Sequence, residues 1–62
     1  MALAALPASA AQRVRGGPAI SQGWASQLAA DACYARGGDP ANDYWYWQDG
    51  DNWYAYVTCQ GI

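Results

Sequence analysis

The sequence contains no histidine, no lysine, no glutamate and no phenylalanine. Without histidine or lysine, its serines have no side chain nearby that commonly serves as a general base, which argues against a nucleophilic catalytic site. Pairs of aspartates can perform acid–base chemistry only in a pocket that shifts their pKa values. A chain of 62 residues seldom encloses such a pocket. We therefore expect a protein that is not an enzyme and that uses no cofactor.

Charge is also scarce, since only 13% of the residues are charged and the net charge is −2. The cations are three arginines, and all five aspartates lie between residues 31 and 51. Binding to nucleic acid depends on cations that neutralise phosphates, so we expect no nucleic acid as partner. No apolar run is long enough to cross a bilayer, so we expect no membrane span. So little charge favours self-association.

Two cysteines are present, and they enclose a loop of 25 residues between Cys33 and Cys59. In an oxidising compartment they would form a disulfide, and a chain this short needs such a link. The loop entropy predicts a stabilisation of about 3.5 kcal/mol. The alternative is two buried free thiols in a cytosolic protein. No further cysteine or histidine is present to complete a zinc site.

The N-terminal segment predicts processing. Residues 1–10 are rich in alanine and end in Ala8-Ser9-Ala10, which fits the small-x-small pattern of signal peptidase sites. We interpret them as the remnant of a secretory signal, with an alanine-rich arm as the alternative. Residues 11–20 contain Gly16-Gly17-Pro18, a helix-breaking sequence, and are interpreted as a linker. The expected location is secreted or periplasmic.

A helix is predicted from Gln22 to about Arg36. Ser21 is a suitable N-cap, and Gly37-Gly38 ends the helical pattern. Apolar residues recur at helical spacing and form the stripe expected to face the core. The stripe consists of Trp24, Leu28, Ala32 and Ala35, with Ala25, Ala29 and Cys33 beside it.

A hairpin is predicted from two aromatic strands, residues 43–48 and 53–59, joined at Asp49-Gly50. A two-residue turn at Asp49-Gly50 would place Tyr46 opposite Trp53. A four-residue loop, residues 49–52, gives the same two faces, whereas a three-residue loop with a bulge would exchange the faces of the first strand. Residues 49–52 also carry side-chain oxygens that suit calcium, but their spacing is better explained by a turn, and we expect no metal.

These elements predict a small α+β fold over residues 21–62, one α-helix followed by an antiparallel β-hairpin and stapled by a disulfide. A bond from Cys59 to the helix turns one face of the hairpin inward. The inward face would carry Tyr44, Tyr46, Trp53, Ala55, Val57 and Cys59. About half of the aromatic rings would then form the core. The opposite face has nothing to cover it, and its predicted partner-binding residues are Trp45, Trp47, Tyr54 and Tyr56.

An exposed aromatic face indicates binding, and three kinds of partner fit. The first is another protein, because tyrosine and tryptophan are enriched at interaction hot spots. The second is further copies of the chain, which would make it a self-assembling structural subunit, either a homo-oligomer or a fibre. The third is a glycan or cell wall, with Trp45, Trp47 and Tyr54 stacking on sugar rings and Asn52 or Asp49 binding hydroxyls. If the hairpin instead has the three-residue loop with a bulge, Tyr44 and Tyr46 replace Trp45 and Trp47 on the exposed face.

Overall fold

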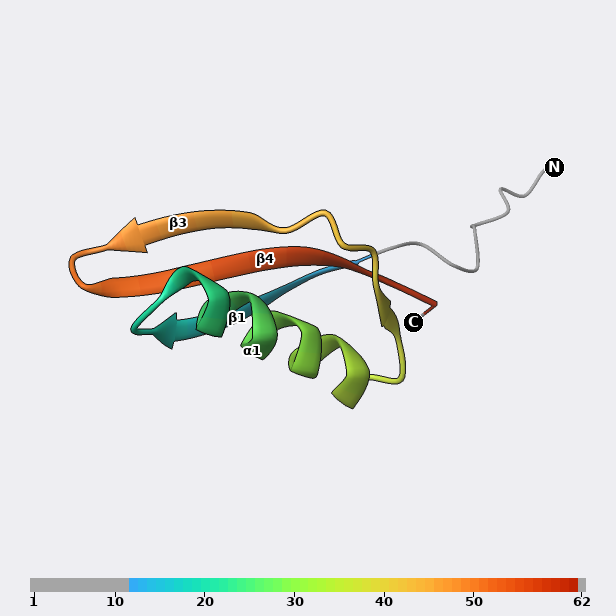
Figure 1. Cartoon of the computed structure of the whole chain (residues 1–62). Coiled ribbons are helices and arrows are strands. Elements are labelled where there is room, and N and C mark those ends of the chain that lie inside the picture. The colour runs from blue at the N-terminus through green and yellow to red at the C-terminus, as the bar shows by residue number, and fades with distance from the viewer. Residues whose placement is uncertain (1–11, 62) are drawn as a thin grey trace, which may run out of the picture.

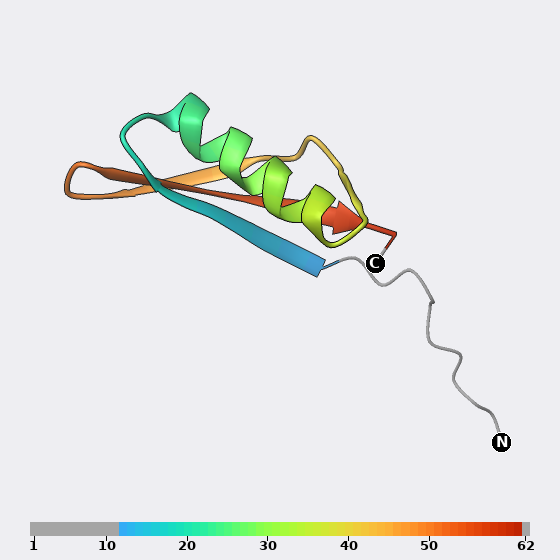
Figure 2. The same cartoon turned by 90° about the horizontal axis from the view of Figure 1, so that it is seen from below.

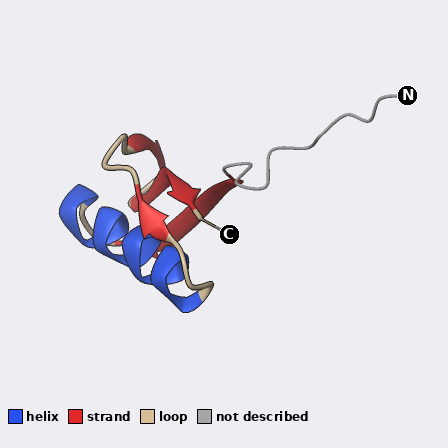
Figure 3. Ribbon diagram, turned by 90° about the vertical axis from the view of Figure 1, so that its right-hand side faces the viewer, coloured by secondary structure: helices blue, strands red, loops and turns tan. Residues whose placement is uncertain are grey.

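A computed structural model describes residues 12–61 as one antiparallel sheet packed against one helix (Figure 1). The elements are β1 (Gln12–Ala19), α1 (Gln22–Ala35), β2 (Asp39–Pro40), β3 (Trp45–Asp49) and β4 (Asn52–Gln60). The fold is a small α+β arrangement, as the sequence predicts. Seen end-on, the helix forms one layer and the strands the other (Figure 3). The proposed signal remnant, residues 1–10, lies outside the described residues.

The sheet contains four strands and is not a simple hairpin. β4 lies in the centre, with β1 antiparallel along one edge and with β2 and β3 antiparallel along the other. The interpretation of residues 11–20 as a linker does not describe this segment, because β1 occupies most of it. Its residues alternate in the way a strand requires, with Val14 and Gly16 buried and Arg13 and Arg15 exposed. Gly16-Gly17-Pro18 obscured that alternation in the sequence.

The helix begins as predicted, since the Trp24 N–H donates a hydrogen bond to Ser21 Oγ at 3.2 Å. The side of the helix that faces the core is centred on Ala25, Ala29 and Cys33, which are fully buried. Trp24, which the prediction placed at the centre of this stripe, is 57% exposed. The reason is the short distance between helix and sheet. Gly16 of β1 touches the backbone of α1, so only small side chains fit between the two elements.

The hairpin pairs Gln48 with Trp53 and Asp49 with Asn52 around a turn at Gly50. The pairing of Gln48 with Trp53 is the register expected for a four-residue loop over residues 49–52. The predicted pairing of Tyr46 with Trp53 is wrong, because Tyr46 lies opposite Ala55, two residues further along β4. A shift of two leaves each side chain on its predicted face. Gly50 has a φ of 63°, a positive angle at the first central position that is typical of type II′ turns.

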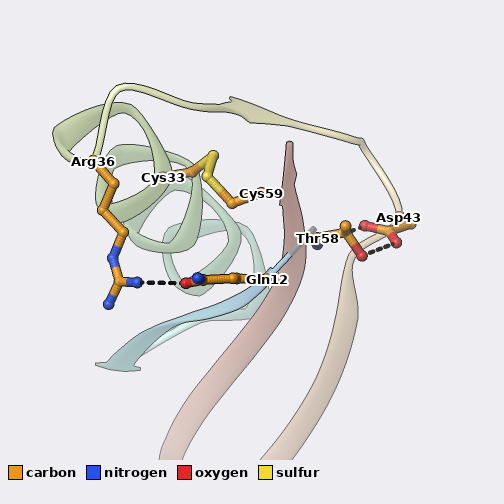
Figure 4. Close-up of a disulfide and its surroundings, with 6 residues drawn as sticks. All are labelled: Gln12, Cys33, Arg36, Asp43, Thr58 and Cys59. Carbon is orange, nitrogen blue, oxygen red and sulfur yellow. Dashed lines mark hydrogen bonds between the residues drawn. A yellow bond between two sulfur atoms is a disulfide. The ribbon is translucent and has the colours of Figure 1, made fainter. Parts of the chain in front are cut away.

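The predicted disulfide joins Cys33 of α1 to Cys59 of β4, with the Cα atoms 5.4 Å apart (Figure 4). Both cysteines are completely buried, and they connect the two layers at the end where α1 finishes. At the same end, Arg36 Nη1 donates a hydrogen bond to Gln12 Oε1 at 3.2 Å. The disulfide between Cys33 and Cys59 is compatible with an oxidising compartment.

The core between the layers is built from small residues. Its buried members are Val14, Ala19, Ala25, Ala29, Cys33, Ala55, Val57 and Cys59. The inward rings Tyr44, Tyr46 and Trp53 are partly buried and pack around this cluster. The hairpin end of β3 and β4 extends past the start of α1 (Figures 1 and 2). Within residues 12–61, no helix is long and apolar enough to cross a membrane.

Candidate binding face of the sheet

The side of the sheet that faces away from α1 carries the four predicted contact residues. We call this side the outer face. Alternation along each strand places Trp45 and Trp47 of β3 beside Tyr56 and Tyr54 of β4, which are their register partners. The two tryptophans are 58% and 40% exposed, and the two tyrosines are half-buried. The four rings thus lie together on one face, and their role in binding stays a prediction.

The rings of the outer face are packed against one another in cross-strand pairs. Trp47 and Tyr54 are stacked, with ring centroids 4.6 Å apart and planes 17° from parallel. Trp45 and Tyr56 are tilted by 47°, with centroids 5.7 Å apart. Pairs of this kind stabilise a sheet by roughly 0.5–1.5 kcal/mol beyond their buried area. The face is therefore held in a defined arrangement before any partner arrives.

Two arginines of β1 complete the outer face. Arg15 lies over the Tyr54 ring with its guanidinium carbon 5.5 Å from the centroid, and Arg13 lies 6.0 Å from the Trp45 centroid. Because β4 separates β1 from β3, Arg15 and Trp47 approach Tyr54 from opposite sides. The Tyr54 ring is therefore enclosed on both faces. Free ring surface remains chiefly on the tryptophans of β3.

Sequence reasoning missed both arginines as members of this face. The signal was present, because Arg13 and Arg15 alternate with Val14 and Gly16 in the period of a strand. The neighbouring Gly-Gly-Pro sequence outweighed it. As a result, the face whose hairpin part is aromatic also carries two of the three cations of the chain.

An open hollow lies at the end of the outer face that is remote from the hairpin turn. It is lined by Arg13, Asp43, Tyr44 and Trp45. Asp43 belongs to the segment between β2 and β3, and its carboxylate is fixed by β4. The Thr58 N–H donates to Asp43 Oδ1 at 2.9 Å, and the Thr58 hydroxyl donates to Oδ2 at 2.6 Å (Figure 4).

The electrostatics of the hollow follow from these contacts. The hydroxyl hydrogen bond from Thr58, followed by its backbone hydrogen bond, lowers the pKa of Asp43 below its usual 3.8, and the charge of Arg13 contributes in the same direction. Asp43 is therefore an ionised acceptor at neutral pH. On the inward side, burial raises the pKa of Tyr44, so its phenol stays protonated.

At the hairpin turn, the side chains of residues 49–52 point into no hollow or metal-binding cluster among the described residues. Asp49, Asp51 and Asn52 are all exposed. In the part of the chain that the structure describes, no three carboxylate, histidine or cysteine residues gather closely enough to hold a metal ion. Asp49 and Asn52 form the last pair of the hairpin ladder, which accounts for their place in the sequence.

Comparisons with models of protein families, with curated proteins and with solved structures found no match for this chain.

Proposed function

We propose that this protein is a non-catalytic binding module whose contact surface is the outer face of its sheet. One observation carries the proposal: Trp45 and Trp47 are 58% and 40% exposed on a face that α1 does not cover. A tryptophan side chain offers some of the largest apolar area available, on the order of 200 Å². Leaving two such side chains in water forgoes burial that a partner can supply.

The arrangement of the face supports this role. The rings stack on each other and against the arginines, so little conformational freedom is lost when a partner docks. Tryptophan, tyrosine and arginine are also the residue types that most often dominate binding energy at protein surfaces. A small fold with a rigid aromatic face therefore suits recognition better than chemistry.

The proposed location is outside the cytoplasm, secreted or periplasmic. The disulfide between Cys33 and Cys59 supports it, since such bonds persist in oxidising compartments. Both sulfurs are completely buried, so the core is built around the bond. A protein whose core depends on a disulfide needs a compartment that maintains it.

The test compares the immobilised, oxidised chain with two variants of it. We expect the Trp45→Ala, Trp47→Ala double variant to lose the partners that the unaltered chain captures from extracellular material of its source, measured by quantitative mass spectrometry. Trp24→Ala is the matched control, because Trp24 lies on the helix side and is 57% exposed, close to the 58% of Trp45. Equal capture by all three proteins would reject the outer face as the contact surface.

Self-association is a second candidate, and the exposure of β3 favours it. One backbone edge of β3 pairs with β4, and the topology gives the other edge no partner among residues 12–61. Of its five residues only Tyr46 is half-buried, although three of the five are aromatic. The strand also lacks the proline, lysine or bulge that often protects an edge. Sedimentation over a concentration series tests this candidate, and a monomer at every concentration would reject it.

A further inference from the structure

Three of the four residues that line the hollow at the end of the outer face supply different binding groups, whereas the fourth, Tyr44, packs against the core. Asp43 supplies hydrogen-bond acceptors, Arg13 supplies donors, and Trp45 supplies a flat apolar ring. They come from three segments: the loop before β3, the first residues of β1, and the start of β3. Only the sheet topology brings them together, because residue 13 is far from residues 43 and 45 in the sequence.

Asp43 is ready to accept hydrogen bonds from a ligand. Thr58 donates one hydrogen bond to each carboxylate oxygen, which fixes the orientation of the group. An ionised carboxylate has about four lone-pair sites, so acceptor capacity remains on both oxygens. The lowered pKa keeps this capacity at neutral and mildly acidic pH. Groups that suit such a fixed acceptor are hydroxyls and amides.

Arg13 is ready to donate. Within residues 12–61 its guanidinium makes no hydrogen bond and no ion pair at salt-bridge distance, and its carbon lies 6.0 Å from the centroid of the Trp45 ring. A centroid distance of 6.0 Å is at the outer limit for a cation–π contact, so this contact is a weak restraint. The five N–H donors of the guanidinium therefore remain available to oxygen atoms of a ligand.

Trp45 supplies the apolar part. Its indole is 58% exposed and is tilted by 47° to Tyr56, so the two rings do not cover each other completely. The face of an indole carries negative electrostatic potential, which attracts the C–H groups on the flat side of a sugar ring. Trp47 follows two residues later on the same strand face, about 7 Å away. A chain of linked sugars can therefore contact both indoles.

The charge of the hollow narrows the class of ligand. Arg13 and Asp43 together contribute no net charge, so neither a strongly anionic nor a strongly cationic ligand gains from entering. A phosphate or an acidic peptide would meet the carboxylate of Asp43 as well as the guanidinium. A neutral sugar has hydroxyls that both donate and accept, together with an apolar side. This matches all three groups of the hollow.

We propose that the hollow formed by Arg13, Asp43 and Trp45 binds one residue of a neutral oligosaccharide, with the following residue on Trp47. This inference rests on the proposed binding function of the outer face and names its ligand class. It moves the polar part of the site away from Asn52 and Asp49, which lie at the other end of the face beside the hairpin turn.

The experiment titrates the oxidised, isotope-labelled chain with neutral hexasaccharides, namely β-1,4-linked glucose, xylose and N-acetylglucosamine and α-1,4-linked glucose. The chain has four tryptophans, so the indole N–H signals report on four places at once. We expect at least one neutral hexasaccharide to shift the Trp45 signal and leave the Trp24 signal in place. α-1,4-Linked galacturonic acid, the acidic probe, should bind more weakly than the neutral ligand.

Variants then test the individual groups. Asp43→Asn and Trp45→Ala should each weaken saccharide binding by about tenfold or more, equivalent to roughly 1.4 kcal/mol. Asp39→Asn and Trp24→Ala are the matched controls, since both residues are exposed and lie outside the hollow, and they should bind as the unaltered chain does. Because the signals of the unaltered chain already locate the ligand, misfolding of a variant does not decide the outcome.

Three results would overturn the inference. They are no shift with any neutral hexasaccharide at millimolar concentration, shifts at Trp24 in place of Trp45, or tighter binding of the acidic probe. If the Trp45→Ala, Trp47→Ala variant nevertheless loses captured partners, the outer face remains the contact surface and only the ligand class is wrong. If that variant also captures everything that the unaltered chain captures, both proposals fail together.

Discussion

The close approach of β1 to α1 at Gly16 predicts a large effect from a single methyl group. A Cβ at this position would lie 2.5 Å from the carbonyl oxygen of Ala25 and 2.7 Å from Cα of Ala29, and closer still to the Ala29 nitrogen. These are backbone atoms of a helix, so they cannot rotate away as a flexible side chain would. Gly16→Ala must therefore push the helix and the strand apart.

The size of the effect follows from this geometry. Overpacking of a close-packed core costs about 1–3 kcal/mol, and rigid backbone neighbours place Gly16→Ala towards the upper end. Gly16 does not have a positive φ, so the conformational strain that alanine suffers at Gly17 or Gly50 does not contribute. The predicted loss is therefore purely steric. In a domain of this size each kcal/mol lowers Tm by about 4–8 °C.

Gly23→Ala is the matched control for this substitution. Gly23 lies in the first turn of α1, is exposed, and would place a Cβ where no other atom lies within 4 Å. Alanine should stabilise this helical position by roughly 0.5–1 kcal/mol. Thermal unfolding of the two oxidised variants, followed by circular dichroism, should therefore show shifts in Tm of opposite sign. If Gly16→Ala is as stable as the unaltered chain, β1 does not pack on α1 and the arginines lose their place on the outer face.

Two further predictions concern the disulfide and Asp43. Cys33→Ala, Cys59→Ala should lower the free energy of unfolding by about 3.5 kcal/mol, from a loop whose ends are 26 residues apart, and urea denaturation that shows a loss below about 1 kcal/mol would contradict this. For Asp43, the folded pKa lies below the unfolded value, so its stabilisation is complete above about pH 4 and disappears as the pH falls through the folded pKa. The stability advantage of the unaltered chain over Asp43→Asn should accordingly be greatest near neutral pH and shrink in acid. If the advantage stays constant from about pH 7 to about pH 2, the hydrogen bonds from Thr58 to the ionised carboxylate are not its cause.

The parts of the fold that depend on local signals could be predicted from the sequence. Ser21 caps α1 because its side chain reaches a backbone N–H three residues away, and that depends on neighbouring residues alone. The disulfide followed from the number of cysteines and the length of the chain. The two faces of the hairpin followed from strand alternation, which a register shift of two residues leaves unchanged.

The parts that depend on distant contacts could not be predicted. β1 pairs with β4 across most of the chain, from Arg13 to Thr58, and nothing near Arg13 in the sequence indicates that partner. Gly16 has the sequence context of a linker glycine, whereas its missing side chain leaves room for the backbone of a helix that begins six residues later at Gln22. The hollow was not predicted for the same reason, because only the unpredicted pairing of β1 with β4 brings Arg13 close to Asp43.

The small size of the core explains why the large rings lie outside it. With α1 and β1 in backbone contact at Gly16, the space between helix and sheet accepts alanine, valine and cystine, and the inward indole of Trp53 is only partly buried beside it. Trp24, on the helix, is accordingly displaced to the surface, and Trp45 and Trp47 occupy the opposite side of the sheet. A thin core supplies little hydrophobic stabilisation, which the disulfide and the stacked outer rings supplement.

This arrangement has a consequence for binding. The outer rings contribute to stability through their mutual stacking, so they are held in place in the free protein, yet the stacking leaves the tryptophans of β3 partly exposed. A ring that is both fixed and exposed loses little entropy when a ligand covers it. The same close packing that excludes aromatic residues from the interior therefore produces the preorganised surface on which the proposed saccharide binding depends.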